Sequence, residues 1–142
     1  MRRRFIAPLE MTKIFMSSLS EARSAKREDL IIMTKVLINK KDGHIISVSA
    51  RGHTDYALEG EDIVCAALSS VMQTALLGLL SVAKIQMSFE RDEEDGLLKF
   101  DIPALDKQQR HDADMILDTM LAGIVDLHEN FSKFIGLKIV KG

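Results

Sequence analysis

The chain has 142 residues and a mass of 15.9 kDa, which suits one packed domain and leaves little room for two. Its hydrophobic content of 46% and its two prolines exclude a disordered or low-complexity chain. A single cysteine excludes an internal disulfide and a multi-cysteine zinc site, and a net charge of -2 without tryptophan argues against direct nucleic-acid binding.

The N-terminal segment differs from the rest of the chain in charge. Residues 1–32 hold seven basic and four acidic residues, whereas residues 33–142 hold twelve basic and seventeen acidic residues. We therefore expect residues 1–32 to be a dispensable N-terminal appendage and residues 33–142 to be the functional domain. Ser18-Leu19-Ser20-Glu21 has the pattern of a capping box, which predicts a short helix from about Leu19 to Leu30. The apolar stretch from Phe5 to Leu9 is too short for the core of a secretory signal. A targeting or membrane-surface helix stays as an alternative for this segment.

The domain begins with the pattern of a β-hairpin. Residues 35–40 and 44–51 read as two strands, and Asp42-Gly43 between them is typical of a tight hairpin turn. Residues 52–61 are polar and contain Gly52 and Gly60 near their ends. This composition predicts a mobile substrate loop with the two glycines as its hinges.

The remaining elements alternate between helix and strand. Residues 62–83 and 106–131 have helical periodicity, whereas residues 85–90, 97–102 and 135–140 read as strands. An acidic segment, residues 92–96, turns the chain between the second pair of strands. The order ββαββαβ predicts a single α+β domain in which two long helices pack on a mixed sheet.

The first of these helices is unusually apolar. Ile63 to Ala83 is an uncharged run of 21 residues, which is long enough to span a membrane. Its hydroxyl, amide and alanine residues and the hairpins on either side favour a buried core helix instead, and we expect no membrane contact. Because one sheet face cannot cover so much apolar surface, the pattern also predicts a homodimer.

Two residues near the start of this helix could carry chemistry. Asp62 is a natural N-cap, which would place Cys65 at the third helical position, beside free N–H groups that favour a thiolate. His53 follows the second strand, and a strand end can lie close to the next helix start. Thiol and imidazole could then form a nucleophile with its acid/base partner. Taken separately, a buried structural cysteine and an exposed loop histidine are the plainer interpretations.

A metal site is not predicted. His111 with Asp112 and Asp114 is interpreted as the solvated start of the second helix, and His44 and His128 are weaker candidates for chemistry than His53. A thiol-redox sensor is disfavoured because the chain has no resolving cysteine.

The segment around these residues resembles the signature of the ribosomal-processing cysteine protease family, Prp. Gly52-His53-Thr54-Asp55-Tyr56-Ala57 and then Gly60-Glu61-Asp62-Ile63-Val64-Cys65-Ala66-Ala67-Leu68-Ser69 match the pattern G-H-A-x-x-A followed by G-x-D-I-V-C-A-A-x-S. Thr54 departs from the alanine of the pattern, and residues 1–32 have no counterpart in a typical member. In length and order of elements, the resemblance extends from Met33 to the C-terminus.

The resemblance implies an activity, a site and a partner. It implies a cytoplasmic, homodimeric endopeptidase without cofactor that removes the N-terminal extension of a large-subunit ribosomal protein, cutting after a Phe-Phe-like pair. His53 and Cys65 match the catalytic pair of the family. On this interpretation His53 holds the thiolate and protonates the leaving amine, and N–H groups at the helix start hold the oxyanion. Because a carboxylate opposes thiol ionisation, Asp62 is assigned to capping the helix or orienting His53.

An alternative belongs to a different class of protein. The chain could be a non-catalytic, ribosome-associated binding or assembly module in which Cys65 is buried and structural. A solvent-accessible Cys65 close to His53 would favour the protease over this module.

Overall fold

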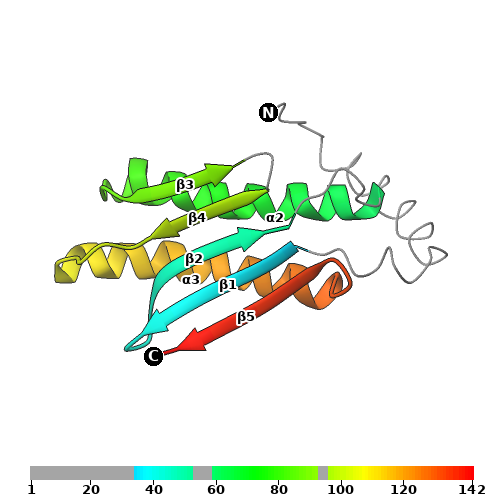
Figure 1. Cartoon of the computed structure of the whole chain (residues 1–142). Coiled ribbons are helices and arrows are strands. Elements are labelled where there is room, and N and C mark those ends of the chain that lie inside the picture. The colour runs from blue at the N-terminus through cyan, green and yellow to red at the C-terminus, as the bar shows by residue number, and fades with distance from the viewer. Residues whose placement is uncertain (1–33, 53–58, 93–95) are drawn as a thin grey trace.

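The computed structural model describes residues 34–52, 59–92 and 96–142, with the backbone alone for residues 59–62. In these ranges the chain forms strands and helices in the predicted order (Figure 1). The elements are β1 (Thr34–Lys41), β2 (His44–Arg51), α2 (Glu59–Leu77), η2 (Gly78–Val82), β3 (Ser88–Asp92), β4 (Leu97–Asp101), α3 (Lys107–Asn130) and β5 (Ile135–Lys141). The single α+β domain is confirmed. The N-terminal appendage and its predicted helix lie outside the described residues.

The strands form one mixed sheet with the order β3-β4-β2-β1-β5. Neighbouring strands are antiparallel except β1 and β5, which are parallel. Both long helices lie on the same face of the sheet, and the other face is open (Figure 1). Side chains of β1 alternate accordingly: Val36 and Ile38 are buried toward the helices, and Lys35 is exposed.

The hydrophobic core fills the space between the sheet and the helices. Its largest fully buried side chains are Phe100, Ile38, Ile45, Leu68, Met72, Leu79, Leu117, Ile124, Ile135, Val36 and Val48. Two glycines mark where α2 and η2 lie beside α3. A Cβ on Gly123 would lie 3.4 Å from Val71 Cγ1, and a Cβ on Gly78 would lie 3.5 Å from Ile116 Cγ2, both ordinary van der Waals distances. These two contacts show that the helices run antiparallel.

The predicted helix over residues 62–83 differs from the structure at both ends. It begins three residues earlier, at Glu59, and its end is a π-helical turn, η2, in which the Ala83 N–H donates to the Gly78 carbonyl at 2.9 Å. Residues 59–62 include three acidic residues, and acidic residues are favourable in the first turn of a helix. The next strand begins late, at Ser88 instead of residue 85, because Ile85 is buried in the core and bonds back to Leu79 O at 2.9 Å.

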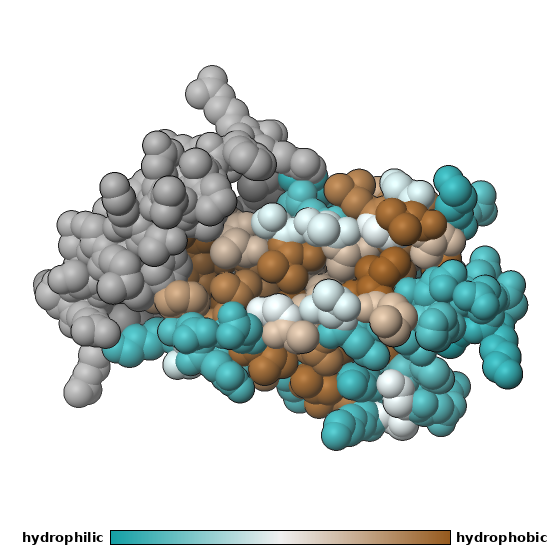
Figure 2. All heavy atoms as spheres, turned by 180° about the vertical axis from the view of Figure 1, so that it is seen from behind, coloured by the Kyte–Doolittle hydropathy of each residue, from teal (hydrophilic) through white to brown (hydrophobic). Residues whose placement is uncertain are grey.

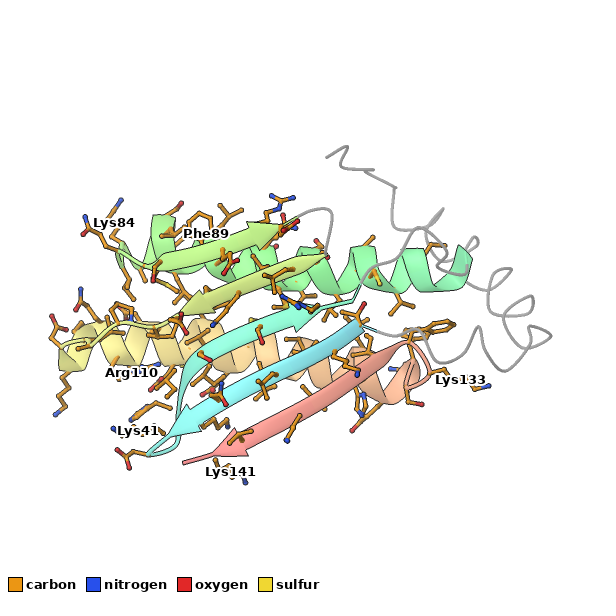
Figure 3. All side chains as sticks on the ribbon, in the orientation of Figure 1. Lys41, Lys84, Phe89, Arg110, Lys133 and Lys141 are labelled. Atoms are coloured by element: carbon orange, nitrogen blue, oxygen red, sulfur yellow. The ribbon has the colours of Figure 1, made fainter. Side chains whose placement is uncertain are left out.

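Polar contacts hold the start of α3 against the β1–β2 hairpin. Asp106 and Gln109 form a reciprocal capping box at the first turn. One turn later, Asp114 accepts from Arg110 at 2.8 Å and lies 2.7 Å from His44 Nδ1. Arg110 also donates to the Ile45 carbonyl at 3.1 Å, and it lies at the hairpin end of the sheet near Lys41 (Figure 3). Within the described ranges no group of three His, Cys, Asp or Glu residues is placed to hold a metal ion.

The helical face of the molecule exposes apolar side chains. In the described part of the chain, one helical run, Ile63–Val82, is long and apolar enough to cross a membrane by length and composition. This run contributes buried side chains such as Leu68, Met72 and Leu79 to the core, and 39% of its most apolar window is buried. Figure 2 shows apolar side chains gathered over the helices on the face away from the sheet. Among the large apolar side chains of α2, η2 and α3, Leu77, Val82 and Met115 are exposed by 57%, 78% and 62%.

Candidate active site

The end of β2 has a backbone conformation that requires glycine. Gly52 has a φ of 140°, which L-amino acids with a side chain rarely adopt. The chain leaves the sheet at this point, and the Gly52 carbonyl lies beside the first residue of β1 and the second turn of α2. Of the two predicted hinge glycines, Gly52 therefore lies directly after β2 in a conformation that favours glycine. Gly60 does not lie in a loop, because it is part of the first turn of α2.

Cys65 is half-buried and lies in the second turn of α2. The prediction that Asp62 caps this helix is wrong, because the helix begins three residues before it. Cys65 is therefore past the third helical position, where its N–H lies within the helical hydrogen-bond ladder and is not free for an oxyanion. The Asp62 side chain and His53 lie outside the described residues, so orientation of His53 by Asp62 stays a prediction. Residues 53–58 of the predicted substrate loop also lie outside them.

Thr34 contacts both the Gly52 carbonyl and the Cys65 thiol. Its hydroxyl donates to the Gly52 carbonyl at 2.8 Å, and its Oγ1 lies 2.9 Å from Cys65 Sγ. Within residues 34–52, 63–92 and 96–142, Thr34 is the one polar residue that is buried. The sequence does not point to this residue, because the predicted first strand begins at residue 35, one residue after it. The available signal was the alternation of β1, which places Thr34 in phase with Val36 and Ile38 toward the core.

The hydroxyl proton of Thr34 has two possible partners. A hydroxyl has one proton, and a carbonyl can only accept, so the bond to Gly52 uses the Thr34 proton. In that arrangement Oγ1 can accept from a Cys65 thiol, and with the hydroxyl turned toward Sγ it can donate to the sulfur instead, because either atom of this contact can be the donor. A second, longer contact of 3.9 Å leads from Sγ to the same Gly52 carbonyl.

A first prediction concerns the backbone at Gly52. Gly52→Ala is expected to lower the free energy of unfolding by about 1–3 kcal/mol, because alanine is strained at this φ. It is also expected to reduce the proteolytic activity that the sequence pattern predicts, because relief of the strain turns the carbonyl away from Thr34. Chemical denaturation and a cleavage assay measure the two effects.

Gly43→Ala is the matched control for this prediction. Gly43 also has a positive φ, 82°, but it lies in the hairpin turn at the opposite end of β2. We expect this variant to lose stability and keep its activity. Equal loss of activity in both variants would contradict a local role of Gly52.

Comparison with known proteins relates this site to proteases. The family model described as cysteine protease Prp matches residues 33–136. The ribosomal processing cysteine protease Prp of Bacillus subtilis is 25% identical over 91 residues, which are 63% of this chain and 81% of that protein. A structure of an essential ribosomal processing protease Prp from S. aureus with a substrate peptide is 25% identical, has a TM-score of 0.68, and matches over 75% of this chain and 99% of that one. A structure of the same protease with a covalently linked product peptide is 26% identical, with a TM-score of 0.65 and the same coverage.

Proposed function

The chain belongs to the family of cysteine protease Prp, and we propose that it removes the N-terminal extension of a large-subunit ribosomal protein, with Cys65 as nucleophile and His53 as acid/base. The observation that carries the proposal is the half-buried Cys65 thiol of α2. It is hydrogen-bonded to Thr34 beside the end of β2, the strand that leads directly to His53. The S. aureus relative is named a ribosomal processing protease and has been seen with a covalently linked product peptide. Covalent chemistry of this kind requires a nucleophile such as a thiolate.

In the proposed mechanism, His53 takes the proton of the Cys65 thiol. The thiolate attacks the carbonyl carbon of the scissile peptide bond, and the bond to the leaving amine breaks as His53 protonates that amine. Water then hydrolyses the thioester and regenerates the thiol. Each step balances with water alone, and the reaction requires no cofactor.

The same proposal assigns the activity to residues 33–142 in the cytoplasm. This part of the chain has twelve basic and seventeen acidic residues, and its excess of negative charge attracts a basic ribosomal protein. Residues 1–32 are dispensable for the activity on this view, since the family match begins at residue 33. The alternative of a non-catalytic module required a buried Cys65. It is disfavoured because Cys65 is not fully buried and the chain belongs to a protease family.

A peptide cleavage experiment tests the proposed function. The full chain is incubated with a peptide that contains a Phe-Phe-Ala segment, and the products are identified by mass spectrometry. We expect one cut after the Phe pair. A peptide with Gly-Gly in place of Phe-Phe and the Cys65→Ala variant are the controls, and neither should give product. Cleavage by Cys65→Ala at the rate of the natural chain would overturn the assignment of the nucleophile.

We also propose that the active protein is a homodimer joined through the exposed apolar face of the helices. Leu77, Val82 and Met115 are the exposed apolar side chains of this face, and burying them between two copies is favourable. Sedimentation at micromolar concentration is expected to show twice the mass of 15.9 kDa. Val82→Glu should convert the dimer to a monomer, whereas Lys99→Glu, a substitution at an exposed position on the open face of the sheet, should leave it intact. A natural chain that sediments as a monomer would contradict the proposal.

A further inference from the structure

The buried hydroxyl of Thr34 connects the two groups that the proposed mechanism needs. It contacts Cys65 Sγ directly at 2.9 Å. It also bonds the Gly52 carbonyl at 2.8 Å, and this carbonyl belongs to the peptide group that joins Gly52 to His53. The Thr34 side chain therefore restrains both the Cys65 thiol and the Gly52 carbonyl, and His53 is the next residue after Gly52.

Thr34 itself is held firmly. Its N–H donates to the Phe134 carbonyl at 2.9 Å, and it pairs with Ile135 of β5 in the parallel ladder. With 5% exposure, it cannot exchange its protein partners for water without local opening. The remaining freedom is rotation of the hydroxyl proton about the Cβ–Oγ1 bond, which moves no heavy atom.

Ionisation of Cys65 changes what this hydroxyl can do. With the thiol protonated, Sγ–H donates to Oγ1, and the hydroxyl donates to Gly52. Once the thiol proton has moved to His53, Oγ1 would present only lone pairs to a negative sulfur, which is unfavourable. Rotation of the hydroxyl gives the thiolate a donor at 2.9 Å, and a hydrogen bond to a charged group is stronger than one to a neutral carbonyl.

We propose that Thr34 is a positioning residue of the Cys65–His53 pair, whose hydroxyl bonds the Gly52 carbonyl while Cys65 is a thiol and turns to bond Sγ when Cys65 is a thiolate. This inference rests on the proposed function. The thiol proton passes to the imidazole of His53, and Thr34 keeps its own proton throughout. No further reactant is needed.

No charged side chain near Thr34 replaces its hydroxyl as hydrogen-bond donor to Cys65 among the residues that the structure describes. Lys35 and Arg51 are paired across β1 and β2 and line the open face of the sheet, opposite to the face that carries Thr34. On α3, the His128 ring donates to the Ile135 carbonyl at 2.8 Å. Along the sequence, the titratable groups nearest to Cys65 are Asp62, Glu61 and Glu59 of α2, and Tyr56, Asp55 and His53 precede them.

Cysteine alkylation provides a direct test, because Cys65 is the only cysteine of the chain. The rate of reaction of the full chain with iodoacetamide is measured from pH 5 to 10, since only the thiolate reacts. Thr34→Val removes the hydroxyl and keeps the shape of the side chain. We expect it to slow alkylation at pH 7 about fivefold to tenfold, since a hydrogen bond to a charged group is lost, and to move the midpoint of the pH profile upward. Thr34→Ser retains the hydroxyl and should restore most of the rate.

Thr119→Val is the matched control, because the Thr119 hydroxyl also donates to a backbone carbonyl, that of Met115 at 2.6 Å, on the exposed side of α3. It should alkylate like the natural chain. In the peptide assay, Thr34→Val should lower kcat more than it changes KM. If Thr34→Val does not fold by circular dichroism, Thr34→Ala replaces it as the variant without a hydroxyl.

The outcomes separate this inference from the proposed function. Alkylation of a folded hydroxyl-free variant with the rate and midpoint of the natural chain overturns the role of Thr34, as does a midpoint that moves downward. An equal loss in Thr34→Ser would show a packing effect and also overturn it. Cleavage that persists in Cys65→Ala would overturn the proposed function instead, whatever the alkylation rates.

Discussion

Replacing His53 with alanine is expected to slow cleavage of the Phe-Phe-Ala peptide by about 10²–10⁴-fold, the range that general acid–base catalysis contributes. The imidazole is needed twice in the proposed mechanism, first to accept the thiol proton and then to protonate the leaving amine. Without it, the fraction of thiolate falls and the amine must leave without a proton donor. The measurement is kcat/KM for the natural chain and the variant under the same conditions.

Two controls identify the cause of this loss. His111→Ala changes an exposed histidine of α3, and it should keep full activity. The double variant His53→Ala/Cys65→Ala should be no less active than Cys65→Ala alone, because residues that act as one unit are not additive. Partial rescue of His53→Ala by added imidazole would support acid–base chemistry. A His53→Ala variant with the activity of the natural chain would contradict the assigned role.

The elements of the sheet and helices could be predicted from the sequence because their signals are local. The Asp42-Gly43 turn fixes the first hairpin, and the structure has β2 at the predicted residues 44–51. α3 likewise begins after the predicted boundary at Asp106, whose side chain caps it. The order of the strands in the sheet could not be predicted in this way. The parallel pairing of β1 with β5 joins the two ends of the domain, and such a pairing leaves no local signal in the sequence.

The site was less accessible to prediction than the fold. The assignment of Asp62 as N-cap failed because more than one residue before Cys65 can start a helix, and the acidic residues 59–62 extend it by three residues. Thr34 was missed because its role depends on contacts with residues 18 and 31 positions away. Cys65 and Gly52 were found through a sequence pattern, whereas the hydroxyl between them is visible only in three dimensions.

The largest effect on stability is expected from Phe100 on β4. Its side chain is fully buried, with 0% exposure, between the sheet and the helices. Phe100→Ala removes most of an aromatic ring from a packed core and leaves a cavity, and such changes cost about 3–5 kcal/mol. This is a large part of the 5–15 kcal/mol that is typical of a small domain, so the midpoint of chemical denaturation should fall strongly.

Phe89 supplies the matched control, because it lies directly opposite Phe100 in the pairing of β3 with β4. It is 53% exposed on an edge strand, where surrounding side chains and water can fill the space of a lost ring. We therefore expect Phe89→Ala to cost about 1 kcal/mol or less, as for substitutions outside the core. The two variants remove the same atoms one strand apart, so the difference between their free energies of unfolding measures the burial of β4 by the helices. Equal losses would mean that the edge of the sheet is covered in solution by something other than this chain's own helices, and a second copy of the chain would then be tested first.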